Sequence, residues 1–188
     1  MIDNTVPANL RGPNNEWVGI AKRSRVIYYN PLNVTEAEMA GLTYEDLSDS
    51  KWKGRIAIRS SGNMYNQSLI SSLIANHGEA TIEAWAKDFV GNFARKPEGN
   101  DRAQIMAVAN GEADIAIANS YYIGLMLSGK KGEEQQSAAR KVQLHFPGQE
   151  GRGAHINVSG AGLMKNAPNK SNAVKFIEFL LGEEAQSH

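Results

Sequence analysis

The chain has 188 residues, of which 41% are hydrophobic and 21% charged, a composition typical of a globular protein. Its 20 Lys and Arg residues balance its 20 Asp and Glu residues, so net charge gives no reason to expect a nucleic-acid partner. The absence of cysteine excludes disulfides, thiolate metal sites and cysteine nucleophiles.

The sequence shows neither a membrane-spanning pattern nor a targeting pattern. No apolar run approaches the ~18 residues that a membrane-spanning helix needs. The N-terminus has no basic region followed by an apolar segment, so no signal peptide is visible, although a mature or truncated exported chain would also lack one.

Hydrophobic periodicity and turn residues predict strands that alternate with helices. Strands are expected at 17–20, 25–29, 55–58, 115–118, 142–146, 155–159 and 162–164, and helices near 35–38, 65–77, 80–95, 101–109, 121–128 and 169–181. The charged segment 130–141 is expected to be an exposed loop or a frayed helix. This alternation is typical of an α/β fold, in which ligands bind beyond the carboxyl ends of the strands.

Two adjacent tyrosines follow one of these strands. Residues 115–118 alternate isoleucine with alanine, which predicts a buried strand, and Asn119-Ser120 suits the beginning of a helix. In the first turn of that helix, Tyr121 and Tyr122 would lie about 100° apart, so both phenols could converge on one ligand. A phenol has a pKa of about 10, so it binds as phenolate only to a strongly polarising cation such as ferric iron. The alternative is ordinary packing, with the hydroxyl groups at the surface.

A second strand end also has polar residues. The loop Ser60-Ser61-Gly62-Asn63 joins the strand 55–58 to a helix, and such a loop presents backbone N–H groups to an anion. It is therefore a candidate anion site. The alternative is an ordinary turn between a strand and a helix.

Three separated segments resemble one protein family. They are residues 59–69 (RSSGNMYNQSL), 113–122 (ADIAIANSYY) and 151–162 (GRGAHINVSGAG). In this order they resemble the ferric-iron-binding periplasmic proteins of bacterial ABC transporters, and the similarity covers essentially the whole chain. Three motifs in the right order are far more specific than any one of them.

The resemblance implies an α/β, type II periplasmic-binding-protein-like lobe with a mixed sheet flanked by helices, in a protein whose two lobes close on Fe³⁺. Residues 1–32 are expected to form hinge strands and part of lobe one, 33–145 the ligand-binding lobe two, and 146–188 the return hinge strands and a helix of lobe one. The family's first lobe adds further ligands, commonly a His-Tyr pair, from a segment that this sequence lacks. The chain is therefore expected to be truncated at both ends.

By the same resemblance, Tyr65, Tyr121 and Tyr122 correspond to the three tyrosine ligands of the second lobe. A synergistic anion such as carbonate, phosphate or citrate is expected at Ser61-Gly62-Asn63 together with Asn119 and Arg59. Arg59 could equally be a structural salt-bridge partner. The remaining tyrosines and one histidine are expected to be structural and not ligands: Tyr28, Tyr29, Tyr44 and His155.

The implied function is that of the substrate-binding component of an iron ABC transporter, with a permease in the inner membrane as its partner. The implied location is the periplasm, or the outside of a Gram-positive cell with a lipid anchor. An alternative is a binding protein of the same scaffold for a small oxyanion or a polyamine. An enzyme is not expected, because the sequence has no thiol, no clear Ser-His-Asp arrangement and no phosphate-loop pattern.

Overall fold

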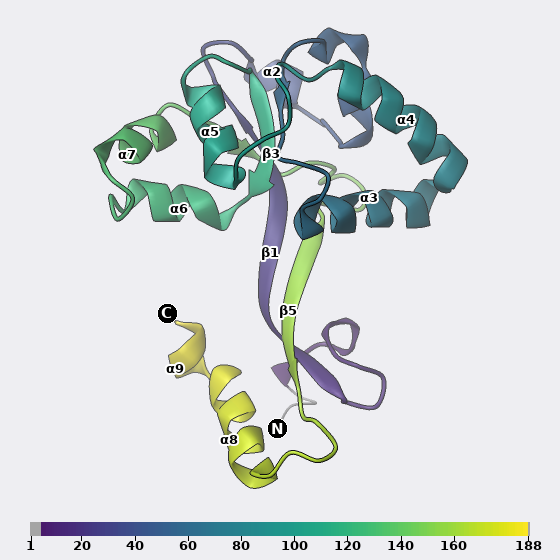
Figure 1. The fold of residues 1–188 in the computed structure, drawn as a ribbon, viewed down its shortest axis with the longest axis vertical. Coiled ribbons are helices and arrows are strands. Elements are labelled where there is room, and N and C mark those ends of the chain that lie inside the picture. The colour runs from purple at the N-terminus through teal and green to yellow at the C-terminus, as the bar shows by residue number, and fades with distance from the viewer. Residues whose placement is uncertain (1–4, 188) are drawn as a thin grey trace. The chain divides into compact units, whose positions relative to one another are not determined.

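The computed structural model describes residues 5–187, which form two compact units (Figure 1). The larger unit comprises Ser24–Ile156, and the smaller unit combines the residues before Ser24 with those after Ile156. The long strand β1 (Trp17–Tyr29) contributes its first half to the smaller unit and its second half to the larger one.

The larger unit is built on a mixed sheet with the strand order β2-β3-β1-β4. The other strands are β2 (Ile56–Ala57), β3 (Ile115–Asn119) and β4 (Gln143–His145). β2 and β3 are parallel, whereas β1 pairs antiparallel with β3 and with β4. In the β1–β3 pair Arg25 lies opposite Asn119, so this register places Arg25 beside the carboxyl end of β3.

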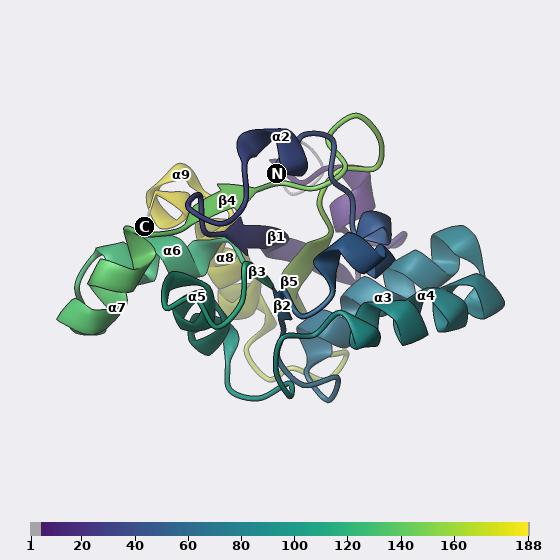
Figure 2. The ribbon, with the colours of Figure 1, turned by 90° about the horizontal axis from the view of Figure 1, so that it is seen from above.

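Helices cover both faces of this sheet, as the two ribbon views agree (Figures 1 and 2). One face holds α3 (Met64–His77) and α4 (Glu79–Gly91), and the other holds α5 (Asp101–Ala109), α6 (Tyr121–Leu127) and α7 (Glu133–Ala139). The connection from β1 to β2 contains the short helix α2 (Glu36–Met39) and the 3-10 turns η2 (Glu45–Ser48) and η3 (Ser50–Trp52).

Alternate side chains of β3 separate two hydrophobic cores, one on each face of the sheet. Ile115 and Ile117 belong to the first core, together with Trp52, Leu69, Leu73, Trp85 and Phe89. Ala116 and Ala118 belong to the second core, together with Ile105, Val108 and Met126. This is the period of two that a strand buried on both faces requires.

The smaller unit contains a second strand that pairs with β1. It is composed of η1 (Ala8–Leu10), the first half of β1, most of β5 (Ile156–Gly162), α8 (Lys170–Leu180) and α9 (Glu183–Gln186). β5 pairs with β1, and a Cβ added at Gly160 would lie 2.8 Å from the carbonyl oxygen of Val18. Only glycine permits this close approach of the two strands.

The mixed α/β sheet flanked by helices is confirmed, but some boundaries differ from the prediction. The strands predicted at 17–20 and 25–29 form one strand, because β5 pairs with β1 as do β3 and β4. The segment 130–141 contains α7, one of the two predicted alternatives. Within residues 5–187, no helix combines the length and the apolar content needed to cross a bilayer.

Candidate functional site

Two helices begin beside the carboxyl end of β3, and each presents phenols in its first turn. α3 begins after Asn63, whose side-chain Oδ1 accepts a hydrogen bond of 3.1 Å from the backbone N–H of Tyr65. α6 begins at Tyr121, directly after Asn119 and Ser120. Asn119 is the last residue of β3, and Ser120 makes no side-chain cap bond, so only α3 has a side-chain cap at its beginning.

The phenols of α6 lie against each other. The ring centroids of Tyr121 and Tyr122 are 4.2 Å apart and their planes are inclined by 31°. Tyr121 is 43% exposed and Tyr122 is half-buried. On α3, Tyr65 is half-buried, and its ring centroid lies 6.0 Å from the guanidinium carbon of Arg25. We call Tyr65, Tyr121 and Tyr122 the phenol rim.

A buried arginine joins the two helix beginnings. Arg25 is fully buried; its Nη2 donates to Asn66 Oδ1 at 2.6 Å, and its Nη1 donates to Asn119 Oδ1 at 3.2 Å. Asn66 follows Tyr65 on α3, and Asn119 is two residues before Tyr121. One guanidinium therefore fixes the spacing between the two chain segments that carry the phenols.

A buried carboxylate neutralises this arginine. Asp101 Oδ2 lies 2.7 Å from Arg25 Nη1 with both side chains fully buried, and it also accepts a 2.9 Å hydrogen bond from the backbone N–H of Asn119. Its other oxygen lies 3.2 Å from Nη1 of Arg59. Burial lowers the pKa of Arg25, and the charge of Asp101 opposes that shift. We call Arg25, Asp101 and Asn66 the buried layer.

In the predicted anion loop, some backbone N–H groups already donate hydrogen bonds within the loop itself. The backbone N–H of Gly62 donates to Ser60 Oγ at 3.2 Å, and that of Asn63 donates to the Ser60 carbonyl at 3.1 Å. Ser61 and Gly62 are exposed and Asn63 is half-buried. Arg59 makes the salt bridge to Asp101 that the sequence left open as its alternative role.

The environment of Tyr121 favours the neutral phenol unless a cation is present. Burial raises the pKa of Tyr121 to about 12, and the Tyr122 hydroxyl adds to the rise, whereas the Asn119 amide opposes it. In the described part of the chain, the buried Nδ2 of Asn119 has no hydrogen-bond partner of normal geometry. A buried donor of this kind near a phenol would stabilise a phenolate once a cation has displaced the proton.

The phenols are the donors at this edge that suit a hard cation. Among residues 5–187, no group of three or more His, Asp or Glu side chains could hold a metal ion. Oxygen donors with a full negative charge suit highly charged, hard cations better than soft ones. The site can therefore offer phenolate oxygens, with the partly exposed Arg59 near them.

The sequence analysis missed Arg25, Asp101 and Asn66. Asp101 next to the start of the helix predicted at 101–109 suggests a cap, but the cap is Asn100, whose Oδ1 accepts from the backbone N–H of Ala103 at 3.1 Å. Asp101 is instead the first residue of α5 and is fully buried. The sequence did contain one signal: Asp101 follows Asn100, which already suits the cap, so Asp101 was free for another role.

The other tyrosines and His155 are structural, as expected. The Tyr28 hydroxyl donates to the Asn119 carbonyl at 3.0 Å, and the Tyr44 hydroxyl donates to the Arg25 carbonyl at 2.6 Å. The Tyr29 hydroxyl lies 2.5 Å from Gln143 Oε1. His155 Nε2 lies 2.9 Å from Ser68 Oγ, and burial lowers its pKa.

The curated proteins that this chain matches include iron-uptake and Fe(3+)-binding proteins. Iron uptake protein A1 of Synechocystis sp. is 54% identical over 187 residues, which cover 100% of this chain and 51% of that protein. The Fe(3+)-binding periplasmic protein of Serratia marcescens is 30% identical over 181 residues, 96% of this chain and 51% of that protein. The chain thus spans about half the length of the curated relatives that it matches.

A solved structure gives the same result. The structure described as Trichodesmium IdiA (FutA) in complex with iron and citrate ligands is 56% identical, with a TM-score of 0.93 over 99% of this chain and 58% of that chain. These matches confirm the resemblance that the three sequence motifs indicated. A family model for bacterial extracellular solute-binding proteins matches residues 2–188. The chain therefore belongs to the family of bacterial extracellular solute-binding proteins.

Proposed function

We propose that this chain binds ferric iron through the phenolates of Tyr65, Tyr121 and Tyr122. The observation that carries the proposal is the buried Arg25, which donates hydrogen bonds to residues on both phenol-bearing segments. The names of the relatives support the choice of metal, since they describe iron uptake and Fe(3+)-binding proteins.

The chemistry of the phenol rim suits Fe³⁺ as a transported ligand. Three phenolates balance the charge of one ferric ion, and oxygen donors favour the ferric over the ferrous state because the harder ion gains more from them. Each phenol must lose its proton on binding, and the raised pKa of Tyr121 makes this loss depend on the cation. Acid or reduction would therefore promote release.

The remaining coordination positions of the ferric ion would take an anion. We propose carbonate, phosphate or citrate at Ser61-Gly62-Asn63, with Asn119 Nδ2 as a further donor and Arg59 as the balancing charge. The buried Nδ2 of Asn119, which has no partner of normal geometry among residues 5–187, supports this assignment. The solved structure described with iron and citrate ligands gives citrate as the first anion to test.

In the whole protein, we propose that residues 33–145 form the ligand-binding lobe two, with hinge segments and parts of lobe one in 1–32 and 146–188. The protein would be a binding protein without enzymatic activity, located in the periplasm or lipid-anchored outside a Gram-positive cell. It would deliver iron to an ABC transporter permease in the membrane, and its first lobe would supply further iron ligands.

The test is a titration of the protein with ferric citrate at neutral pH, monitored by the visible charge-transfer band of phenolate bound to Fe³⁺. Wild-type protein should turn red to orange, and Tyr121→Phe should lose most of the band and weaken iron binding by more than about 100-fold. Loss of a direct ligand should exceed the 10–100-fold effect typical of residues around the ligands.

The matched control is Tyr29→Phe, which removes one phenol oxygen at the other end of the same strand pair. Tyr29 lies opposite Ile115, four residues or about 13 Å along the strand from the Arg25–Asn119 pair. This variant should keep the band. A colourless wild-type protein, or equal iron binding by Tyr121→Phe, would overturn the proposal in favour of a small oxyanion or a polyamine as the ligand.

A further inference from the structure

A groove between α3 and α4 is lined without the three tyrosines of the phenol rim. Its volume is about 450 Å³, within the range of roughly 300–1,000 Å³ that is usual for small-molecule sites. Its lining is largely apolar, and none of the three rim tyrosines contributes to it. The residues that decide its chemistry are Phe89, Val90, Phe93, Arg59 and Lys96.

Aromatic rings form one wall of the groove. Trp85 and Phe89 are stacked with centroids 4.5 Å apart, and Phe89 and Phe93 meet edge to face at 5.0 Å. Beside them Val90, on α4, is 58% exposed. An apolar ligand would remove this surface from water, and a planar aromatic ring could stack on or meet the edges of these rings.

The charged residues of the groove are both cations. The lining contains Arg59 and Lys96 but no carboxylate. Arg59 uses Nη1 for Asp101, while its buried Nε has no hydrogen-bond partner among residues 5–187. Lys96 is exposed and forms no ion pair within the described chain. Arg59 and Lys96 therefore give the groove a positive charge that no carboxylate of its lining offsets.

We propose that this groove binds a small aromatic carboxylate. The ring lies against Phe89, Phe93 and Val90, and the carboxylate pairs with the guanidinium of Arg59 and the ammonium of Lys96. The apolar wall gives affinity, and the two cations select an anion over a neutral or cationic aromatic molecule. The groove shares Arg59 and Ser61 with the proposed anion position, but the rim tyrosines take no part in it, so binding there does not require iron.

The probe is 2-naphthoate, titrated into iron-free protein by isothermal calorimetry with tryptophan fluorescence as a second signal. We expect saturable one-to-one binding. Val90→Glu places a like charge at the exposed edge of the groove and should weaken binding by more than about tenfold. Lys96→Gln removes one exposed cation and should weaken it about threefold.

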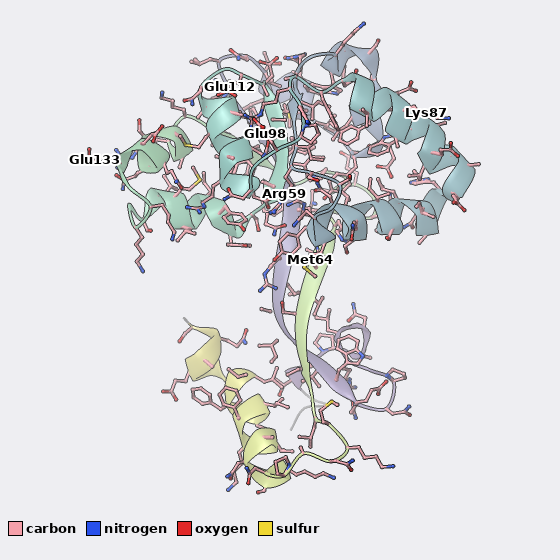
Figure 3. The ribbon with its side chains drawn as sticks, viewed as in Figure 1. Arg59, Met64, Lys87, Glu98, Glu112 and Glu133 are labelled. Atoms are coloured by element: carbon pink, nitrogen blue, oxygen red, sulfur yellow. The ribbon has the colours of Figure 1, made fainter. Side chains whose placement is uncertain are left out.

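Lys87→Gln is the matched control for the charge change. Lys87 is on α4, pairs with Glu83 and lies apart from Arg59 (Figure 3), so its variant should bind like the wild type. Because Val90, Lys96 and Lys87 are exposed, all variants should retain the wild-type circular dichroism and melting temperature. Tyr121→Phe should also bind 2-naphthoate normally, which separates this proposal from the proposed iron site.

The outcomes that overturn the proposal are specific. One is the absence of saturable 2-naphthoate binding to folded wild-type protein. Another is equal binding of 2-naphthylmethylammonium, which has the same ring system and the opposite charge. A third is unchanged affinity in the folded Val90→Glu variant, which would place the bound naphthoate elsewhere.

Discussion

The buried layer and the phenol rim are neighbours that differ in how their polar groups are satisfied. In the buried layer, Arg25, Asp101 and Asn66 bond mainly to one another and to the backbone. In the rim, Tyr121 is 43% exposed and its phenol faces a second phenol. The buried layer therefore fixes the geometry of this edge, whereas the rim leaves phenols available for the ligand binding that we propose.

The position of the remaining tyrosines supports this division. Tyr28 and Tyr44 are buried, and their hydroxyls donate to the backbone carbonyls of Asn119, at the end of β3, and of Arg25, within β1. Burial raises the pKa of Tyr44 to about 12 and raises that of Tyr28 as well. The phenols of Tyr28 and Tyr44 therefore have a structural role. The burial and the hydrogen bonds of a tyrosine distinguish these two from the tyrosines of the phenol rim.

The largest expected effect concerns protons at the phenol rim. If three phenols lose their protons on binding Fe³⁺, affinity should fall by up to about a thousandfold for each unit of decreasing pH near neutrality, or tenfold per phenol. Competition with a chelator of known pH dependence measures this slope. Tyr121→Phe should reduce the slope by about one proton, and an affinity independent of pH would show that phenolates are not the ligands.

The next effect tests the buried layer alone. Asp101→Ala leaves the guanidinium of Arg25 buried and unpaired, so it should reduce the free energy of unfolding by about 3–5 kcal/mol in urea titrations. The control is Glu112→Ala, which removes the half-exposed partner of Arg95 and should cost less than about 1 kcal/mol. Equal costs for the two variants would contradict the structural role of the buried layer.

Alkaline pH should destabilise the protein through its buried phenols. Tyr44 has a pKa of about 12 in the folded chain and about 10 when unfolded, so the unfolded chain loses its proton first as pH rises. The stability from this group is fully present below pH 10 and is lost between about pH 10 and 12, a change of about 3 kcal/mol. Urea unfolding across this range measures it, and Tyr44→Phe should show a smaller decline. Parallel curves for the two proteins would refute this role of Tyr44.

The smallest effect compares the two helix beginnings directly. Asn63→Ala removes the side-chain cap of α3 and should cost about 1 kcal/mol of folding free energy. Ser120→Ala changes a residue that makes no cap bond at the beginning of α6, so it should cost less than about 0.5 kcal/mol. Thermal unfolding of the pair measures the difference, and a larger cost at Ser120 would reverse the comparison.

Local patterns predicted the strand and the helix that position Tyr121 and Tyr122, but not the buried layer beneath them. The alternation at 115–118 predicted β3, and the helix expected near 35–38 is present as α2. By contrast, Arg25 and Asp101 are 76 residues apart in sequence, and no local pattern of residues predicts that they form an ion pair. The groove between α3 and α4 could not be predicted from the sequence either, because it depends on how two amphipathic helices pack against each other.

The most direct measurement is anomalous diffraction at the iron absorption edge, using crystals of the protein grown with ferric citrate. We expect one strong peak at bonding distance from the phenol oxygens of Tyr65, Tyr121 and Tyr122 together. An iron peak elsewhere on the protein, or three hydroxyl groups too far apart to share one ion in crystals that contain bound iron, would contradict the proposed site.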